Sequence, residues 1–119
     1  MSNELNLESP QAKEENVIKY STNWNNKLDC DSFTTIRLHS NKYQVGKEYT
    51  VNLKGKDLKR VKIVDKKVLL LSDINEFIAQ IDTGYSRQKC IDIIKKMYHN
   101  LNLNWDTQKI DFILQQTIK

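Results

Sequence analysis

Arg37 ends a short run, Ser32-Phe33-Thr34-Thr35-Ile36-Arg37, in which polar side chains alternate with apolar ones. In an extended strand Phe33, Thr35 and Arg37 share one face. A guanidinium that faces a cleft suits bidentate contact with a phosphate or a base edge, because its planar fork matches two acceptor atoms. The same side chain can instead form a structural ion pair with a carboxylate, and Thr34 and Thr35 can be present only because threonine favours strands. Both interpretations stay open.

Positive charge is concentrated in the middle of the chain. The sequence has a net charge of +4, and residues 42–67 alone contain nine basic residues against three acidic ones. A localised positive field attracts polyanions and is typical of nucleic-acid binders. The alternative is that lysines on an exposed strand edge prevent it from pairing with other chains. The residues of this segment that we expect to contact phosphates are Lys54, Lys56, Lys59 and Arg60.

The first residues have the opposite charge. Residues 1–16 hold four glutamates against one lysine and show no sustained apolar period. We predict a disordered acidic tail over 1–16 and one folded domain over 17–119, because a chain of 119 residues has the size of a single domain. The tail is a candidate contact for the basic segment or for a partner protein.

Several classes of protein are excluded by composition. Cys30 and Cys90 are too few for a disulfide framework, and with His39 and His99 far apart they form no four-ligand metal set. No apolar run approaches the roughly 18 residues of a membrane span, and residues 1–4 lack a basic signal-peptide start. We expect a cytoplasmic protein with buried thiols, and without membrane contact, metal or other cofactor.

Alternating apolar residues predict strands over 33–38, 47–53 and 60–71, the last as one or two strands broken at 65–67. Residues 17–28 fit either a short strand or an irregular segment whose aromatic side chains pack on the sheet. In the last part of the chain Ile110, Phe112 and Leu114 fall at every second position and predict a closing strand.

The apolar period changes after residue 72. Asp73 is placed to cap a short helix that Gly84 ends. Ser86 is placed to cap a second helix, whose apolar residues form one stripe from Cys90 to Leu101. Strands followed by helices and a returning strand indicate an α+β barrel and not a doubly wound sheet.

These pieces, in this order, resemble an ASCH domain, a small β-barrel of the PUA-like superfamily. The resemblance is carried by Thr-Thr-Ile-Arg at 34–37, Tyr-x-x-Gly-Lys at 43–47, the leucine-rich strand end at 68–71 and Asp-Thr-Gly-Tyr-Ser at 82–86. It implies an α+β fold, a mixed β-barrel with two or three helices packed on it. It also implies a cleft beside the first of these strands that binds RNA or a modified nucleobase.

Some proteins with this pattern are amidohydrolases that act on acylated cytidine. They use a lysine, a threonine three residues later, an arginine two residues beyond that, and a glutamate. The resemblance would make Thr35 the nucleophile, Arg37 its electrostatic support and Glu76 the acidic group, but the lysine position is Ser32. A threonine hydroxyl is a poor nucleophile without a base or a neighbouring cation. The sequence therefore favours a protein that is not an enzyme.

The first hypothesis is thus a non-catalytic module that binds RNA or a modified nucleotide. Its cleft would be bordered by Thr35, Arg37, Tyr85 and Ser86, with the four basic residues named above on the phosphates. Tyr85 could stack on a base or pack its ring on the barrel, and Trp24 is a second candidate for stacking. The alternatives are the hydrolase and an accessory protein of a phage or mobile element that uses the barrel to bind another protein.

Overall fold

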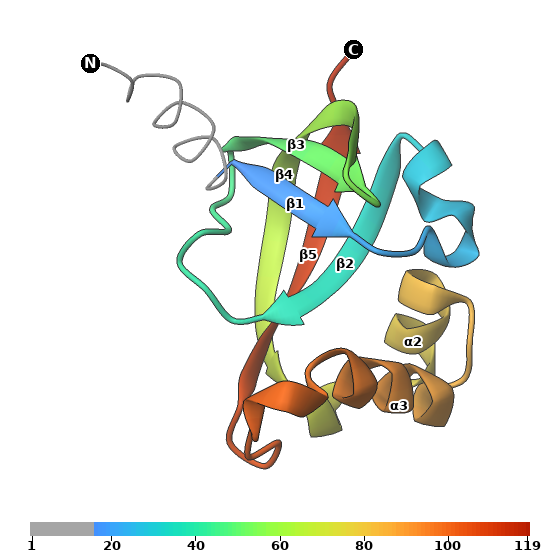
Figure 1. Cartoon of the computed structure of the whole chain (residues 1–119), viewed down its shortest axis with the longest axis vertical. Helices are drawn as coiled ribbons and strands as arrows, with labels where there is room; N and C mark the ends of the chain where they lie inside the picture. Colours follow the sequence, from blue (N-terminus) through green and yellow to red (C-terminus); the bar gives the residue numbers. More distant parts are fainter. Residues whose placement is uncertain (1–15) are drawn as a thin grey trace.

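The fold is a curved mixed sheet with helices packed beside it (Figure 1). It is seen in a computed structural model that describes residues 16–119. The predicted tail therefore lies outside the described residues except for Asn16, whose carbonyl accepts from the backbone N–H of Thr50 at 2.8 Å. The α+β class and the half-barrel sheet confirm the fold expected from the sequence.

The sheet has five strands in the spatial order β1-β3-β4-β5-β2. Only the β1–β3 pair is parallel, and the other three pairs are antiparallel. β1 and β2 therefore lie at the two edges of the sheet. The strands are β1 (Val17–Tyr20), β2 (Ser32–Leu38), β3 (Glu48–Leu53), β4 (Lys56–Leu70) and β5 (Lys109–Thr117).

β4 is one continuous strand, so the predicted break at 65–67 is wrong. It pairs with β3 and then with β5, and its register shifts between Ile63 and Asp65. A bulge of this kind absorbs an extra residue without ending the strand. Lys66 stays on the strand because its ammonium donates to the carbonyls of Ser40 at 3.0 Å and Tyr43 at 2.8 Å.

Residues 16–119 also contain two α-helices and three short 3-10 helices, with the bounds η1 (Trp24–Asp29), η2 (Leu71–Asp73), α2 (Glu76–Thr83), α3 (Arg87–Met97) and η3 (His99–Leu101). Asn75, not Asp73, caps α2 by accepting from the backbone N–H of Ile78 at 2.8 Å. Gly84 ends α2 at φ 80°, and Ser86 caps α3 by accepting from the backbone N–H of Lys89 at 3.3 Å. The predicted ends at Gly84 and Ser86 are confirmed.

The burial pattern of β5 differs from the one expected from its apolar residues Ile110, Phe112 and Leu114. Its fully buried side chains include Asp111, Ile113 and Gln115, whereas Leu114 is exposed. Asp111 tolerates burial because it accepts from His39 Nδ1 at 2.8 Å and from the backbone N–H of Ser40 at 3.0 Å. Gln115 donates to the Tyr20 hydroxyl at 2.8 Å. Buried polar groups with such partners cannot be told from surface ones by hydropathy alone.

The core has two parts. One fills the half-barrel around Ile18, Tyr49 and Ile113, and the other lies where α2 and α3 meet the sheet, around Ile74 and Cys90. The predicted α3 stripe is buried only at Cys90, Ile91 and Ile94, since Met97 and Leu101 are exposed. Cys30 is exposed as well, contrary to the expectation of two buried thiols.

Candidate functional site

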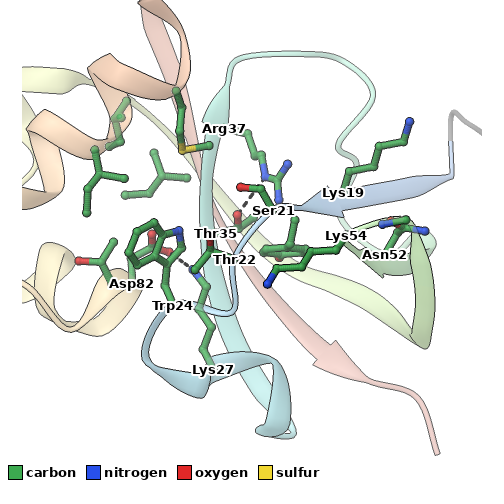
Figure 2. A pocket seen from close by; sticks show the side chains of 17 residues that line it. Lys19, Ser21, Thr22, Trp24, Lys27, Thr35, Arg37, Asn52, Lys54 and Asp82 are labelled. Carbon is green, nitrogen blue, oxygen red and sulfur yellow. Dashed lines mark hydrogen bonds and ion pairs between the residues drawn. The ribbon is translucent and has the colours of Figure 1, made fainter.

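A pocket of about 570 Å³ lined by several polar side chains lies between the two edge strands (Figure 2). Its walls come from β1 and the residues after it, from β2, and from the β3–β4 turn, and η1, α2 and α3 border the rest. Because β1 and β2 pair with no strand on this side, the seam of the half-barrel stays open. The fold thus places a hollow beside the Thr35–Arg37 segment.

A buried ion pair lies at the bottom of this pocket. Lys27 Nζ donates to Asp82 Oδ1 at 2.9 Å, and the Thr34 hydroxyl donates to the same oxygen at 2.9 Å. Burial lowers the pKa of Lys27, and the charge of Asp82 only partly opposes this shift. Lys27 therefore loses its proton at a lower pH than an exposed lysine does.

Local sequence explains how Lys27 reaches the pocket. Asn25 and Asn26 both adopt the left-handed conformation, with φ of 57° and 54°, which asparagine tolerates better than other non-glycine residues. The resulting kink turns Lys27 and Leu28 inward. The kink packs closely against Gly84, where an added Cβ would lie 3.0 Å from Asn25 Cγ.

Arg37 lies on the wall of the pocket and is held on two sides. Its Nε donates to the Thr35 hydroxyl at 3.0 Å, and its guanidinium carbon lies 4.5 Å from the centre of the Tyr20 ring. Burial raises the pKa of Tyr20, so this ring stays a neutral phenol. None of the carboxylates in residues 16–119 forms an ion pair with Arg37. Within this part of the chain, the structural ion pair considered above is not formed.

The pocket carries an excess of positive charge. Asp82 is the one acidic residue that lines it within the described chain, and Lys27 balances that charge. Lys19, Arg37 and Lys54 add three further cations. Lys54 belongs to the turn between β3 and β4, and Figure 2 shows its side chain extending from this turn toward the pocket. The electrostatics of the site therefore favour an anionic ligand.

The other predicted phosphate contacts lie outside the lining of this pocket. Lys56 is exposed at the start of β4. Lys59 donates to the carbonyl of Cys30 at 3.0 Å and covers the ring of Phe33. Arg60 donates to Thr50 Oγ1 at 2.9 Å and pairs with Glu48 at 3.3 Å.

The C-terminal end of α2, and not the turn after it, contributes residues to the pocket. Tyr85 and Ser86 do not line the pocket, whereas Asp82 and Thr83 do. Tyr85 packs edge-on against Trp24 at 5.9 Å between ring centres, and the Ser86 hydroxyl caps α3. Trp24, half-buried, does line the pocket.

Glu76 is also outside the pocket. It is exposed on α2, where its carboxylate accepts from the backbone N–H of Arg87 at 3.0 Å. The carboxylate that the same helix brings to the pocket is Asp82, six residues later. Burial raises the pKa of the Cys90 thiol to about 11, so this thiol is not a nucleophile near neutral pH.

The described part of the chain, residues 16–119, has neither a metal-ligand cluster nor a membrane-spanning helix. No group of three or more histidine, cysteine, aspartate or glutamate side chains there could hold a metal ion. No helix in this part of the chain is both long enough and apolar enough to cross a membrane.

The fold is similar to two crystal structures of other proteins. One is an ASCH domain from Lactobacillus crispatus JV V101, with 14% identity and a TM-score of 0.59 over 85% of this chain and 77% of that one. The other is protein EF3133 from Enterococcus faecalis V583, of family DUF984, with 10% identity and a TM-score of 0.61 over 97% and 91%. A scan of family models and a search of curated proteins found no match. At such low identity the similarity shows the fold, and it confirms the ASCH-type architecture.

Proposed function

We propose that this chain, which has the fold of an ASCH domain, binds RNA or a modified nucleotide in the pocket between β1 and β2. The observation that carries the proposal is the placement of Arg37 on the pocket wall, held by Thr35 and Tyr20. An arginine fixed in this way has lost its side-chain entropy before a ligand arrives, so it binds a phosphate or a base edge at lower cost.

Two other residues support a nucleotide as the ligand. Trp24 presents a half-buried aromatic ring to the pocket, and base stacking on such a ring contributes about 1–3 kcal/mol. Lys54 adds a cation at the β3–β4 turn. Together they supply the two elements of single-strand binding, a stacking surface and positive charge.

Binding of a short, labelled, single-stranded RNA should therefore weaken with rising salt. Two to three phosphate contacts predict a loss of affinity of roughly 5–20-fold between 50 and 200 mM salt. Fluorescence anisotropy titrations would measure it. Lys54→Ala should flatten the salt dependence, and Lys62→Ala, an exposed lysine of β4 outside the pocket, should not. Absence of binding at 50 mM salt would contradict the proposal.

A second candidate function is amide hydrolysis of an acylated cytidine. The observation that favours it is Lys27, because this lysine lines the same pocket as Thr35 although Ser32 occupies the position where the related hydrolases have lysine. A buried lysine with a lowered pKa is a suitable base for a threonine hydroxyl. In this scheme Thr35 Oγ attacks the acyl carbon while the neutral amine of Lys27 takes the hydroxyl proton. Lys27 returns that proton to the cytosine amine as the C–N bond breaks, and water then cleaves the acyl-threonine ester to release the acid.

Incubation with N4-acetylcytidine would test this candidate. We expect release of cytidine by the native chain and loss of at least 100-fold in rate in Thr35→Ala, the size of effect typical when general-base or nucleophilic chemistry is removed. Ser32→Ala is the matched control on the same strand and should keep the native rate. Equal turnover by the native chain and Thr35→Ala would contradict Thr35 as nucleophile.

A further inference from the structure

We infer that the pocket takes a nucleotide through a terminal phosphate, a phosphomonoester held between Arg37 and Lys54, and not through the interior of a strand. This inference rests on the proposed nucleotide binding and specifies which part of the ligand the site selects.

Arg37 keeps two donors for the ligand. Its Nε is used by the Thr35 hydroxyl, and one face of its guanidinium lies on the Tyr20 ring. Neither Nη atom has a hydrogen-bond partner among residues 16–119, although the side chain lines the pocket. The free Nη pair forms a fork whose geometry matches two oxygens of one phosphate.

The charge balance favours a dianion. The Lys27–Asp82 pair is neutral as a unit. Three further cations line the pocket, Lys19, Arg37 and Lys54. Arg37 and Lys54 form no ion pair with a carboxylate of the described chain, so at least two positive charges can be neutralised by a ligand. A phosphomonoester carries a charge of about −1.5 to −2 near neutral pH. A phosphodiester inside a strand carries only one negative charge for each phosphate.

Two basic residues farther along β4 are engaged with the protein itself, which disfavours a continued path for a backbone. A protein that binds the interior of a strand has a positively charged groove that follows the phosphates. Here Lys56 is exposed at the start of β4, whereas Lys59 and Arg60, farther along the strand, are bound to the Cys30 carbonyl and to Glu48. The volume of about 570 Å³ falls within the range of pockets that enclose one small ligand.

Calorimetric titrations can test the inference with one short RNA made in three forms, with a 5′-phosphate, with a 3′-phosphate, or with hydroxyls at both ends. Adenosine and cytidine monophosphates are compared in parallel with their nucleosides. We expect one phosphorylated form to bind at least 10-fold more tightly than the hydroxyl form, and the monophosphates to bind more tightly than the nucleosides. A preference for the mononucleotide or for the strand end identifies the source of the phosphate, and both results support the inference.

Arg37→Lys keeps the positive charge but removes the fork, so it should reduce this phosphate preference to less than 3-fold. Lys62→Met is the matched control and should leave the preference unchanged. Equal affinity for phosphorylated and hydroxyl-ended RNA would overturn the terminal-phosphate inference while the proposed function stands. Absence of binding by every RNA and nucleotide would overturn the proposed function itself.

Discussion

Replacing Asp82 by alanine is expected to lower the free energy of unfolding by about 3–5 kcal/mol, the cost of removing one partner from a buried ion pair. Lys27 Nζ lies 2.9 Å from Asp82 Oδ1, and the two side chains are only 6% and 7% exposed. The substitution also leaves the Thr34 hydroxyl without its acceptor. Urea unfolding followed by circular dichroism would measure the loss.

Asp92→Ala is a suitable control, because Asp92 is an exposed carboxylate of α3 that accepts only from Gln88. We expect it to change stability by less than about 0.5 kcal/mol. The double variant Lys27→Met with Asp82→Leu should recover most of the loss, since no buried charge remains. A loss below about 1 kcal/mol in Asp82→Ala would contradict a tightly buried pair.

The pH dependence gives an independent check of the same pair. Burial lowers the pKa of Lys27 in the folded chain, and Asp82 opposes that shift. Without Asp82 the folded pKa falls further below the unfolded value of about 10.4. The unfolded chain then binds more protons between the two values, so the stability of Asp82→Ala should rise with pH over that interval. The rise should be steeper than in the native chain.

Much of the fold could be predicted from the sequence because it depends on local signals. The alternation in 33–38 and 47–53 marks strands, and Gly84 and Ser86 mark helix ends through backbone conformation and capping. The wrong predictions concern positions whose structure depends on residues that are distant in the sequence. The predicted break in β4 depended on the polar run at 65–67, and the ammonium of Lys66 is satisfied by carbonyls some twenty residues away in sequence.

The candidate site was only half predictable. Thr35 and Arg37 share one face of a strand, which alternation alone predicts. Lys27 and Asp82 are 55 residues apart in sequence, and nothing in the spacing of either residue indicates the contact. The Asn25-Asn26 pair is the signal that could have been used, because two asparagines in succession favour a left-handed kink and hence a change in which side chains point inward.

Glu76 and Asp82 illustrate the same limit. Both lie on α2. Glu76 was the predicted acidic group of the site because the related hydrolases use a glutamate. In the structure Glu76 is exposed near the start of the helix, whereas Asp82 lies near its end and is buried against β2. Which end of a short helix meets the sheet depends on tertiary packing, not on the helical period.

A second buried carboxylate, Asp111, gives the last prediction. Its side chain is fully buried on β5 and holds the start of the loop between β2 and β3. It accepts from His39 Nδ1 at 2.8 Å and from the backbone N–H of Ser40 at 3.0 Å, and it lies 3.4 Å from Lys66 Nζ. Arg37 is its neighbour across the β2–β5 pair, so the same carboxylate stabilises the strand end that carries the pocket arginine.

Asp111→Asn should therefore lower the free energy of unfolding by about 2–4 kcal/mol. The asparagine side chain places an NH₂ donor where a carboxylate oxygen accepted a hydrogen bond, so that two donors face each other. Hydrogen exchange should increase first at residues 40–46, while α2 and α3 keep their native protection at low denaturant. Asp106→Asn, an exposed aspartate before β5, is the control and should change neither. Native protection of the loop in Asp111→Asn would show that other contacts hold it, such as the bond from the Gly46 N–H to the Ile63 carbonyl at 2.8 Å.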